Sequence, residues 1–124
     1  MTEKASIRVF IADDHAIVRE GLKQILAEQR DIVVAGEAET GLDAVKLFRK
    51  PRCNVLLLDI SLPDRNGIEV LKQIKSEKPD LAVLMLSMHR EDQYAIRSLK
   101  AGAAGYLTKQ SAPKELVNAI RQVA

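Results

Sequence analysis

The 124 residues, 47% hydrophobic and 29% charged, fit one globular domain with a single core. The 19 basic residues are interleaved with 17 acidic ones, so the net charge of +2 forms no basic stripe and gives direct nucleic-acid binding little support. One cysteine, Cys53, excludes an internal disulfide, and no apolar stretch approaches the roughly 18 residues of a membrane span, so we expect a cytoplasmic protein without membrane contact.

Five apolar segments bounded by turn residues predict strands along the chain. After each strand, apolar residues recur at intervals of three or four, which predicts a helix. The predicted strands are IRVFIA (7–12), IVVAGEA (32–38), CNVLLLD (53–59), LAVLMLS (81–87) and AGYLTK (104–109). The helical sets are Val18, Leu22, Ile25 and Leu26; Ala44, Val45 and Phe48; Val70, Leu71 and Ile74; Ala95, Leu99 and Gly102; and Leu116, Ile120 and Val123.

Several residues have the chemistry of helix ends. Thr40 is placed to cap the second helix, and Ser111 the fifth, whose first turn holds Pro113 where a missing N–H costs nothing. Pro79 and Gly102 are placed to end the third and fourth helices. Strict alternation of strands and helices with short connections predicts a doubly wound α/β domain, a parallel sheet covered by helices on both faces.

Polar residues stand where four of the predicted strands end. Ligands of such sheets bind beyond the carboxyl ends of the strands, so these residues form the candidate site. Each has an ordinary reading as well: a helix cap, a turn hydroxyl or a surface charge. The buried run VLLL makes Asp59 the hardest to dismiss, because a buried carboxylate needs a partner. The residues are Asp13 and Asp14, Asp59, Ser87 and Lys109.

Clustered carboxylates require a cation. Two unit charges about 4 Å apart repel by roughly 4 kcal/mol at an effective dielectric near 20, and Lys109 supplies one positive charge for three acids. Ligands made only of oxygen favour Mg²⁺ or Mn²⁺ over Zn²⁺, so we expect Mg²⁺. His15 follows the acidic pair, but we expect it to be exposed and outside the metal shell.

A carboxylate beside a metal and a lysine can form an aspartyl phosphate. Asp59, Mg²⁺ and Lys109 fit those roles, and the Ser87 hydroxyl would donate to a phosphoryl oxygen. A small Mg²⁺-dependent phosphatase would use the same chemistry. The motif of haloacid-dehalogenase-like phosphatases is D-x-D, whereas this chain has DIS, which removes the general acid/base.

FIADDH, LLLDISLPDRNG, LMLS and AGYLTK, in this order, resemble the response-regulator receiver domain of two-component signalling. The resemblance implies a flavodoxin-like (βα)5 fold with strand order 2-1-3-4-5. It makes Asp59 the phosphoacceptor, Asp14 a direct Mg²⁺ ligand with Asp13 in the second shell, and the carbonyl of Ser61 a further ligand. Ser87 becomes the switch hydroxyl, Lys109 the phosphoryl-binding lysine and Tyr106 the switch aromatic, although Tyr106 also fits an aromatic packed at a sheet edge.

DDH and AGAAGYLTK further resemble the NarL/FixJ branch, whose receivers are joined to LuxR-type helix-turn-helix domains. One departure is Gln110, which follows the lysine where many receivers have proline; a cis peptide there would cost about 2.5–4 kcal/mol without proline. The resemblance implies a phosphohistidine on a sensor histidine kinase, or a small phosphate carrier, as donor. It also implies a possible homodimer on phosphorylation, and a switch surface presenting Tyr94, Arg97, Lys100, Lys114 and Arg121, which otherwise form a solvated helix face.

The sequence IRQVA at residues 120–124 is in an apolar helical phase without a stop signal. We therefore expect residues 1–124 to be a receiver domain and the native protein to continue into a C-terminal DNA-binding domain, through which alone it would contact DNA. Two alternatives stay open: a stand-alone receiver that acts by protein contact, and an interaction module of this fold that is never phosphorylated.

Overall fold

Five strands and five helices alternate along the part of the chain that the computed structural model describes, residues 6–49, 52–88 and 92–124. The alternation agrees with the periodicities of the sequence. In chain order the elements are β1 (Ile7–Ala12), α1 (Ala16–Ala27), β2 (Ile32–Ala38), α2 (Gly41–Leu47), β3 (Val55–Asp59), α3 (Gly67–Glu77), β4 (Ala82–Ser87), α4 (Asp92–Lys100), β5 (Gly105–Thr108) and α5 (Ala112–Val123).

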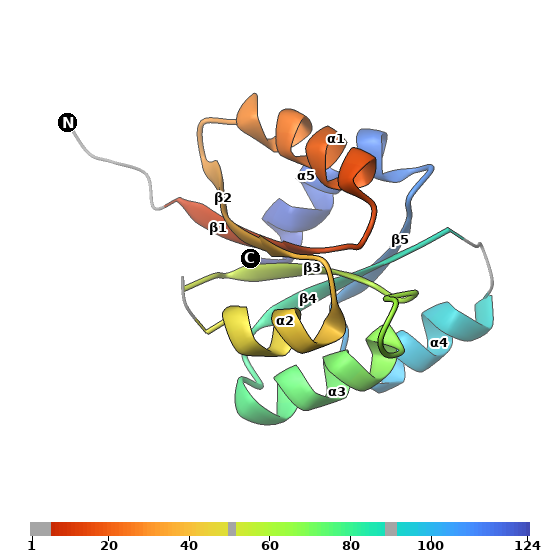
Figure 1. Ribbon diagram of the computed structural model, residues 1–124. Coiled ribbons are helices and arrows are strands. Elements are labelled where there is room, and N and C mark those ends of the chain that lie inside the picture. The colour runs from red at the N-terminus through yellow and green to blue at the C-terminus, as the bar shows by residue number, and fades with distance from the viewer. Residues whose placement is uncertain (1–5, 50–51, 89–91) are drawn as a thin grey trace.

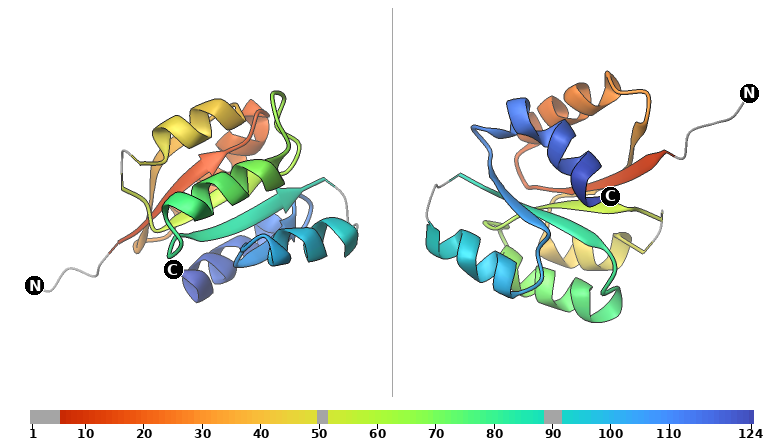
Figure 2. Two further views of the ribbon diagram at one scale, coloured as in Figure 1. Left: turned by 90° about the horizontal axis from the view of Figure 1, so that it is seen from below. Right: turned by 180° about the vertical axis from the view of Figure 1, so that it is seen from behind.

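The strands form one parallel sheet in the order β2-β1-β3-β4-β5, which confirms the predicted fold and strand order. Helices α1 and α5 cover one face, and α2, α3 and α4 cover the other (Figure 1). The view from behind in Figure 2 shows the same division. No helix in the described ranges is long and apolar enough to cross a membrane.

Side chains of β3 alternate between two core layers because successive residues of a strand point to opposite faces. Val55 and Leu57 pack in the layer beneath α1 and α5, while Leu56 and Leu58 pack in the layer on the side of α2 and α3. All four are 0% exposed, and burying each such side chain stabilises the fold by roughly 1.5–3 kcal/mol. The strand is thereby fixed in register, and the next residue, Asp59, is carried into the interior.

Two of the predicted helix ends are confirmed in detail. The Thr40 hydroxyl accepts the N–H of Asp43 at 3.0 Å at the start of α2, and Gly102 follows α4 with a φ of 107°, a conformation that favours glycine. Ser111 stands at the N-cap of α5 as predicted, but its hydroxyl bonds to Thr108 instead of the helix.

The predicted buried face of α4 is wrong. Leu99, assigned to the core by its spacing from Ala95 and Gly102, is 53% exposed, whereas Ser98 is 0% exposed. Tyr94 packs against the core layer of α2 and α3 instead. A helix at the margin of a sheet touches it along a narrow strip, and here the small Ser98 faces inward while Leu99 lies outside. The spacing of apolar residues alone does not distinguish these two faces.

Candidate functional site

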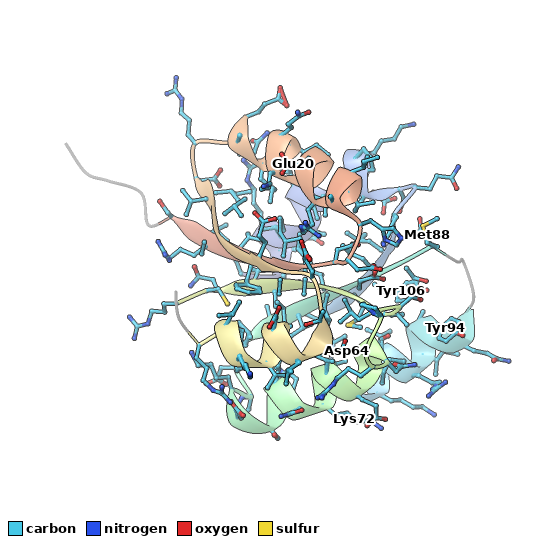
Figure 3. All side chains as sticks on the ribbon, viewed as in Figure 1. Glu20, Asp64, Lys72, Met88, Tyr94 and Tyr106 are labelled. Atoms are coloured by element: carbon cyan, nitrogen blue, oxygen red, sulfur yellow. The ribbon has the colours of Figure 1, made fainter. Side chains whose placement is uncertain are left out.

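The polar residues predicted at the strand ends do meet at one edge of the sheet, the carboxyl edge. Asp13 and Asp14 follow β1, Asp59 and Ser87 are the last residues of β3 and β4, and Lys109 follows β5. Met88, the residue after Ser87, is labelled near this edge in Figure 3. Parallel pairing of β1 with β3 and of β4 with β5 aligns these ends.

Lys109 is the centre of the cluster. Its Nζ lies 2.8 Å from Asp13 Oδ2, 3.1 Å from Asp59 Oδ2 and 3.2 Å from His15 Nδ1. The lysine side chain is 6% exposed, and those of Asp13 and Asp59 are 0% and 1% exposed. Burial alone would lower the pKa of Lys109, but the two carboxylates outweigh it and raise the pKa. One ammonium therefore stabilises two buried carboxylates.

The Asp59 carboxyl is buried among charges of both signs, and these surroundings shift its pKa. Burial raises the pKa of its carboxyl above the usual value, and the negative charge of Asp13 adds to this effect. The N–H of Ser61, which donates to Oδ1 at 3.0 Å, and the Lys109 ammonium act in the opposite direction and lower the pKa only in part. Such a carboxylate gains from any further positive charge placed near it.

The acidic pair after β1 is arranged around His15. Asp13 Oδ1 accepts the backbone N–H of His15 at 2.8 Å, and His15 Nδ1 lies 3.1 Å from Asp13 Oδ1 and from Asp14 Oδ1. His15 is exposed as expected, with 54% of its side chain accessible, but its Nδ1 turns into the cluster. Sequence reasoning placed the residue and missed this orientation.

The donor set fits a divalent metal ion. One ligand atom from each of Asp13, Asp14, His15 and Asp59 lies within 4.8 Å of the others. Asp13 Oδ2 and Asp14 Oδ1 are buried atoms; Lys109 Nζ lies 2.8 Å from the first, and His15 Nδ1 lies 3.1 Å from the second. Buried carboxylate oxygens gather negative charge that a cation offsets, and hard divalent ions prefer oxygen ligands of this kind. The cluster can therefore hold a metal ion.

The loop after β3 is fixed at both ends. The N–H of Gly67 donates to the Ile60 carbonyl at 2.6 Å, and a Cβ on Gly67 would lie 2.2 Å from the Asp59 carbonyl oxygen, so only glycine fits. Asp64 accepts the N–H groups of Gly41 and Leu42 at 2.7 and 2.9 Å, which caps α2 and lowers the pKa of Asp64. Asp64 is not among the residues predicted at the site. The metal-binding role of the Ser61 carbonyl stays a prediction.

The residues predicted to form the switch lie on the two neighbouring strands β4 and β5. Ser87 is 2% exposed, and its carbonyl accepts the N–H of Lys109 at 2.7 Å, which ties the ends of β4 and β5 together. Tyr106 is paired with Met85 across the two strands, and its half-buried ring packs against the core layer of α2 and α3. Their roles in switching stay predictions.

Arg19 is the residue of this region that sequence reasoning did not identify. It lies on α1, is 8% exposed, and its Nη1 donates to the Asp13 carbonyl at 2.7 Å. Its other donors reach Glu37 at 2.9 Å and Glu39 at 3.1 Å, at and after the end of β2. A signal was present, since an arginine within the apolar stripe of a helix needs buried acceptors.

Known proteins share both the sequence pattern and the fold. The response regulator receiver domain family matches residues 9–121. Response regulator UvrY of Escherichia coli K12 is 43% identical over 117 residues, which are 94% of this chain and 54% of UvrY.

Solved structures agree. A LuxR-family two-component response regulator from Aurantimonas sp. SI85-9A1 matches with a TM-score of 0.90 at 34% identity, covering 96% of this chain and 85% of that one. The signal receiver domain of NarL from Mycobacterium tuberculosis matches with a TM-score of 0.87 at 34% identity, with 96% of each chain covered. The chain spans about half the length of the curated relatives it matches.

Proposed function

The chain belongs to the response regulator receiver family of two-component signalling, and from that premise we propose that Asp59 is its phosphoacceptor. The observation that carries the proposal is the environment of Asp59, a 1% exposed carboxylate whose Oδ2 lies 3.1 Å from Lys109 Nζ. A carboxylate oxygen of Asp59 attacks the phosphorus of a phosphohistidine on a sensor histidine kinase. The P–N bond breaks, and its electron pair returns to the histidine of the kinase.

Each neighbour of Asp59 has a role in this proposal. Lys109 is positioned to bind oxygens of the transferred group, which gains negative charge density in the transition state. The hydroxyl of Ser87 donates to a phosphoryl oxygen, and Tyr106 follows its movement. The domain promotes only its own phosphorylation and dephosphorylation, as a switch and not as an enzyme that turns over a separate substrate.

Mg²⁺ is the proposed cofactor, and Mn²⁺ would serve in its place. Asp14, Asp59 and the carbonyl of Ser61 would hold the ion, with Asp13 beside them, in the oxygen-rich cluster described above. When bound, the ion supplies positive charge that neutralises oxygens of the transferred group. Lys109 pairs with both Asp13 and Asp59, and these two carboxylates raise its pKa.

The output of the switch is proposed to be transcription. The LuxR-family match favours a full-length protein in which residues 1–124 form the receiver and a separate C-terminal domain binds DNA in the cytoplasm. Phosphorylation would change the surface made by α4, β5 and α5, where Arg97, Lys100 and Lys114 are exposed, and so alter contact between domains or promote a homodimer. Arg121, assigned earlier to this surface, pairs with Asp31 at 2.8 Å.

The test is labelling of the chain with acetyl phosphate. With Mg²⁺, the intact mass should increase by one phosphoryl group, and Asp59→Asn should abolish the increase. Asp80→Asn, a change at an exposed carboxylate outside the cluster, should label like the parent. Asp14→Ala should raise the Mg²⁺ concentration needed for labelling. Equal labelling of Asp59→Asn would refute the assignment, and continuous release of phosphate would indicate a phosphatase instead.

A further inference from the structure

His15 differs from the other members of the cluster because it offers a nitrogen. The residue is the N-cap of α1, with extended backbone angles of −91° and 108°, and its own N–H donates to Asp13 Oδ1 at 2.8 Å. This backbone hydrogen bond fixes the position of the His15 main chain, from which the ring extends. Although 54% of the side chain is exposed, Nδ1 lies 3.1 Å from carboxylate oxygens of Asp13 and Asp14.

His15 Nδ1 also faces the Lys109 ammonium. The Lys109 ammonium lies 2.8 Å from Asp13 Oδ2, 3.1 Å from Asp59 Oδ2 and 3.2 Å from His15 Nδ1. His15 Nδ1 therefore lies within hydrogen-bond distance of this ammonium and of two carboxylates, and whether it donates or accepts depends on the tautomer of the ring. A group that already faces a cation together with carboxylate oxygens has the orientation that a metal ligand requires.

Imidazole nitrogen and carboxylate oxygen select different metals. Mg²⁺ prefers oxygen ligands and retains several waters, whereas Mn²⁺, Co²⁺ and Zn²⁺ accept imidazole, with affinity rising along the first transition row to copper. A site with one nitrogen in reach therefore gains affinity for transition metals without gaining affinity for Mg²⁺. The donor atoms of Asp13, Asp14, His15 and Asp59 lie within 4.8 Å of one another, close enough to share one ion.

We propose that His15 Nδ1 is a protein ligand when the acidic cluster binds a transition metal ion such as Mn²⁺ or Co²⁺, so that the His15 ring strengthens the binding of these ions and not the binding of Mg²⁺. The proposal rests on the metal site of the proposed function and adds its metal class. The ring replaces a water of the ion and loses only its contacts with Lys109 and the carboxylates. Because it is half exposed, it can adjust without repacking the core.

The decisive measurement is a pulsed electron paramagnetic resonance spectrum of Mn²⁺ added to the chain without any phosphodonor. We expect modulation from one directly bound ¹⁴N, which changes to a ¹⁵N pattern when the protein is made with ¹⁵N-histidine. His15→Gln should abolish the coupling. His89→Gln, which alters the other histidine of the sequence, should retain it and so controls for ions bound elsewhere. A spectrum of the parent protein without histidine nitrogen would overturn the proposal.

Calorimetric titration gives the second measurement. His15→Gln should weaken Co²⁺ binding at least about 10-fold, the lower end of what loss of a metal-supporting group costs, and leave Mg²⁺ affinity within about twofold. Equal losses for both ions would assign His15 a structural role only. Because the isotope experiment needs no variant, it decides the question even if His15→Gln unfolds. A parent protein that binds Mn²⁺ through His15 but is not labelled by acetyl phosphate would refute the proposed function and leave this inference standing.

Discussion

Replacing Asp59 with asparagine should stabilise the metal-free domain, because the Asp59 carboxylate is buried away from water. At an effective dielectric near 20, the Lys109 ammonium at 3.1 Å attracts it by about 5 kcal/mol. Asp13, with a ligand atom within 4.8 Å, repels it by about 3.5 kcal/mol or more. The net attraction of roughly 2 kcal/mol or less is smaller than the several kcal/mol that dehydrating a buried ion costs.

The cost of removing the Asp59 charge from water therefore exceeds the net attraction by its neighbours, in agreement with the raised pKa of Asp59. Asparagine keeps an acceptor for the N–H of Ser61 and removes the charge. We expect Asp59→Asn to increase the free energy of unfolding at pH 7 by about 1–3 kcal/mol and to raise Tm by about 4–12 °C, measured by circular dichroism with urea or heat in a chelator. Asp80→Asn, at an exposed position, should stay within about 0.5 kcal/mol of the parent.

The gain in free energy of unfolding from Asp59→Asn should decrease as the pH falls. A carboxyl group whose pKa is higher in the folded than in the unfolded state destabilises the fold above the folded pKa, and the destabilisation disappears as pH falls to the unfolded value near 3.8. The advantage of Asp59→Asn should shrink as pH falls from 7 toward 4, and it should also shrink when Mg²⁺ stabilises the parent. A variant no more stable than the parent at pH 7, or a gain that is constant with pH, would refute the reasoning.

Three further changes test other parts of the site. Arg19→Met, which keeps the stem and removes the donors, should lower the free energy of unfolding by about 1–3 kcal/mol in urea titrations and weaken Mg²⁺ binding in calorimetry; loss of stability with unchanged Mg²⁺ affinity would show that the arginine does not position the site. Gly67→Ala places a Cβ 2.2 Å from the Asp59 carbonyl oxygen and should lower the free energy of unfolding by about 3 kcal/mol or more, so a melting temperature equal to the parent's would contradict the close approach. Ser87→Ala should leave Mg²⁺ binding intact and remove the change that beryllofluoride, as a phosphoryl analogue, causes in the NMR signals of Tyr106; identical changes in both proteins would disprove the coupling.

The parallel sheet could be predicted from the sequence because the strands are continuous apolar runs and the helices have apolar stripes. VLLL could only be a strand buried on both faces, and the parallel sheet then brought Asp59 to the same edge as Asp13 and Lys109. This prediction needs only the direction of each strand. Side-chain orientation was not required to place those residues.

The features that were missed depend on contacts between segments distant in the chain. The direction of the His15 ring depends on Lys109, 94 residues away, and the buried Arg19 depends on Glu37 of the neighbouring strand. The error at α4 has a related cause: with Leu99 outside and Ser98 inside, the face was chosen by how the helix meets the sheet edge and not by hydrophobicity. Hydrophobic periodicity indicates which face of a helix is buried on average. It carries no information about which side chains from distant segments pair with that helix.

Hydrogen bonds along the loop between β3 and α3 fix the length of that loop. It is held by the hydrogen bond from Gly67 to Ile60, the bridge between Ser61 and Asn66, and the clamp of Asp64 on the first turn of α2. An insertion or deletion here would release at least one of these attachments and shift the start of α3 relative to Asp59. The number of residues between Asp59 and α3 is therefore constrained more strongly than the side chains at the exposed positions of this loop.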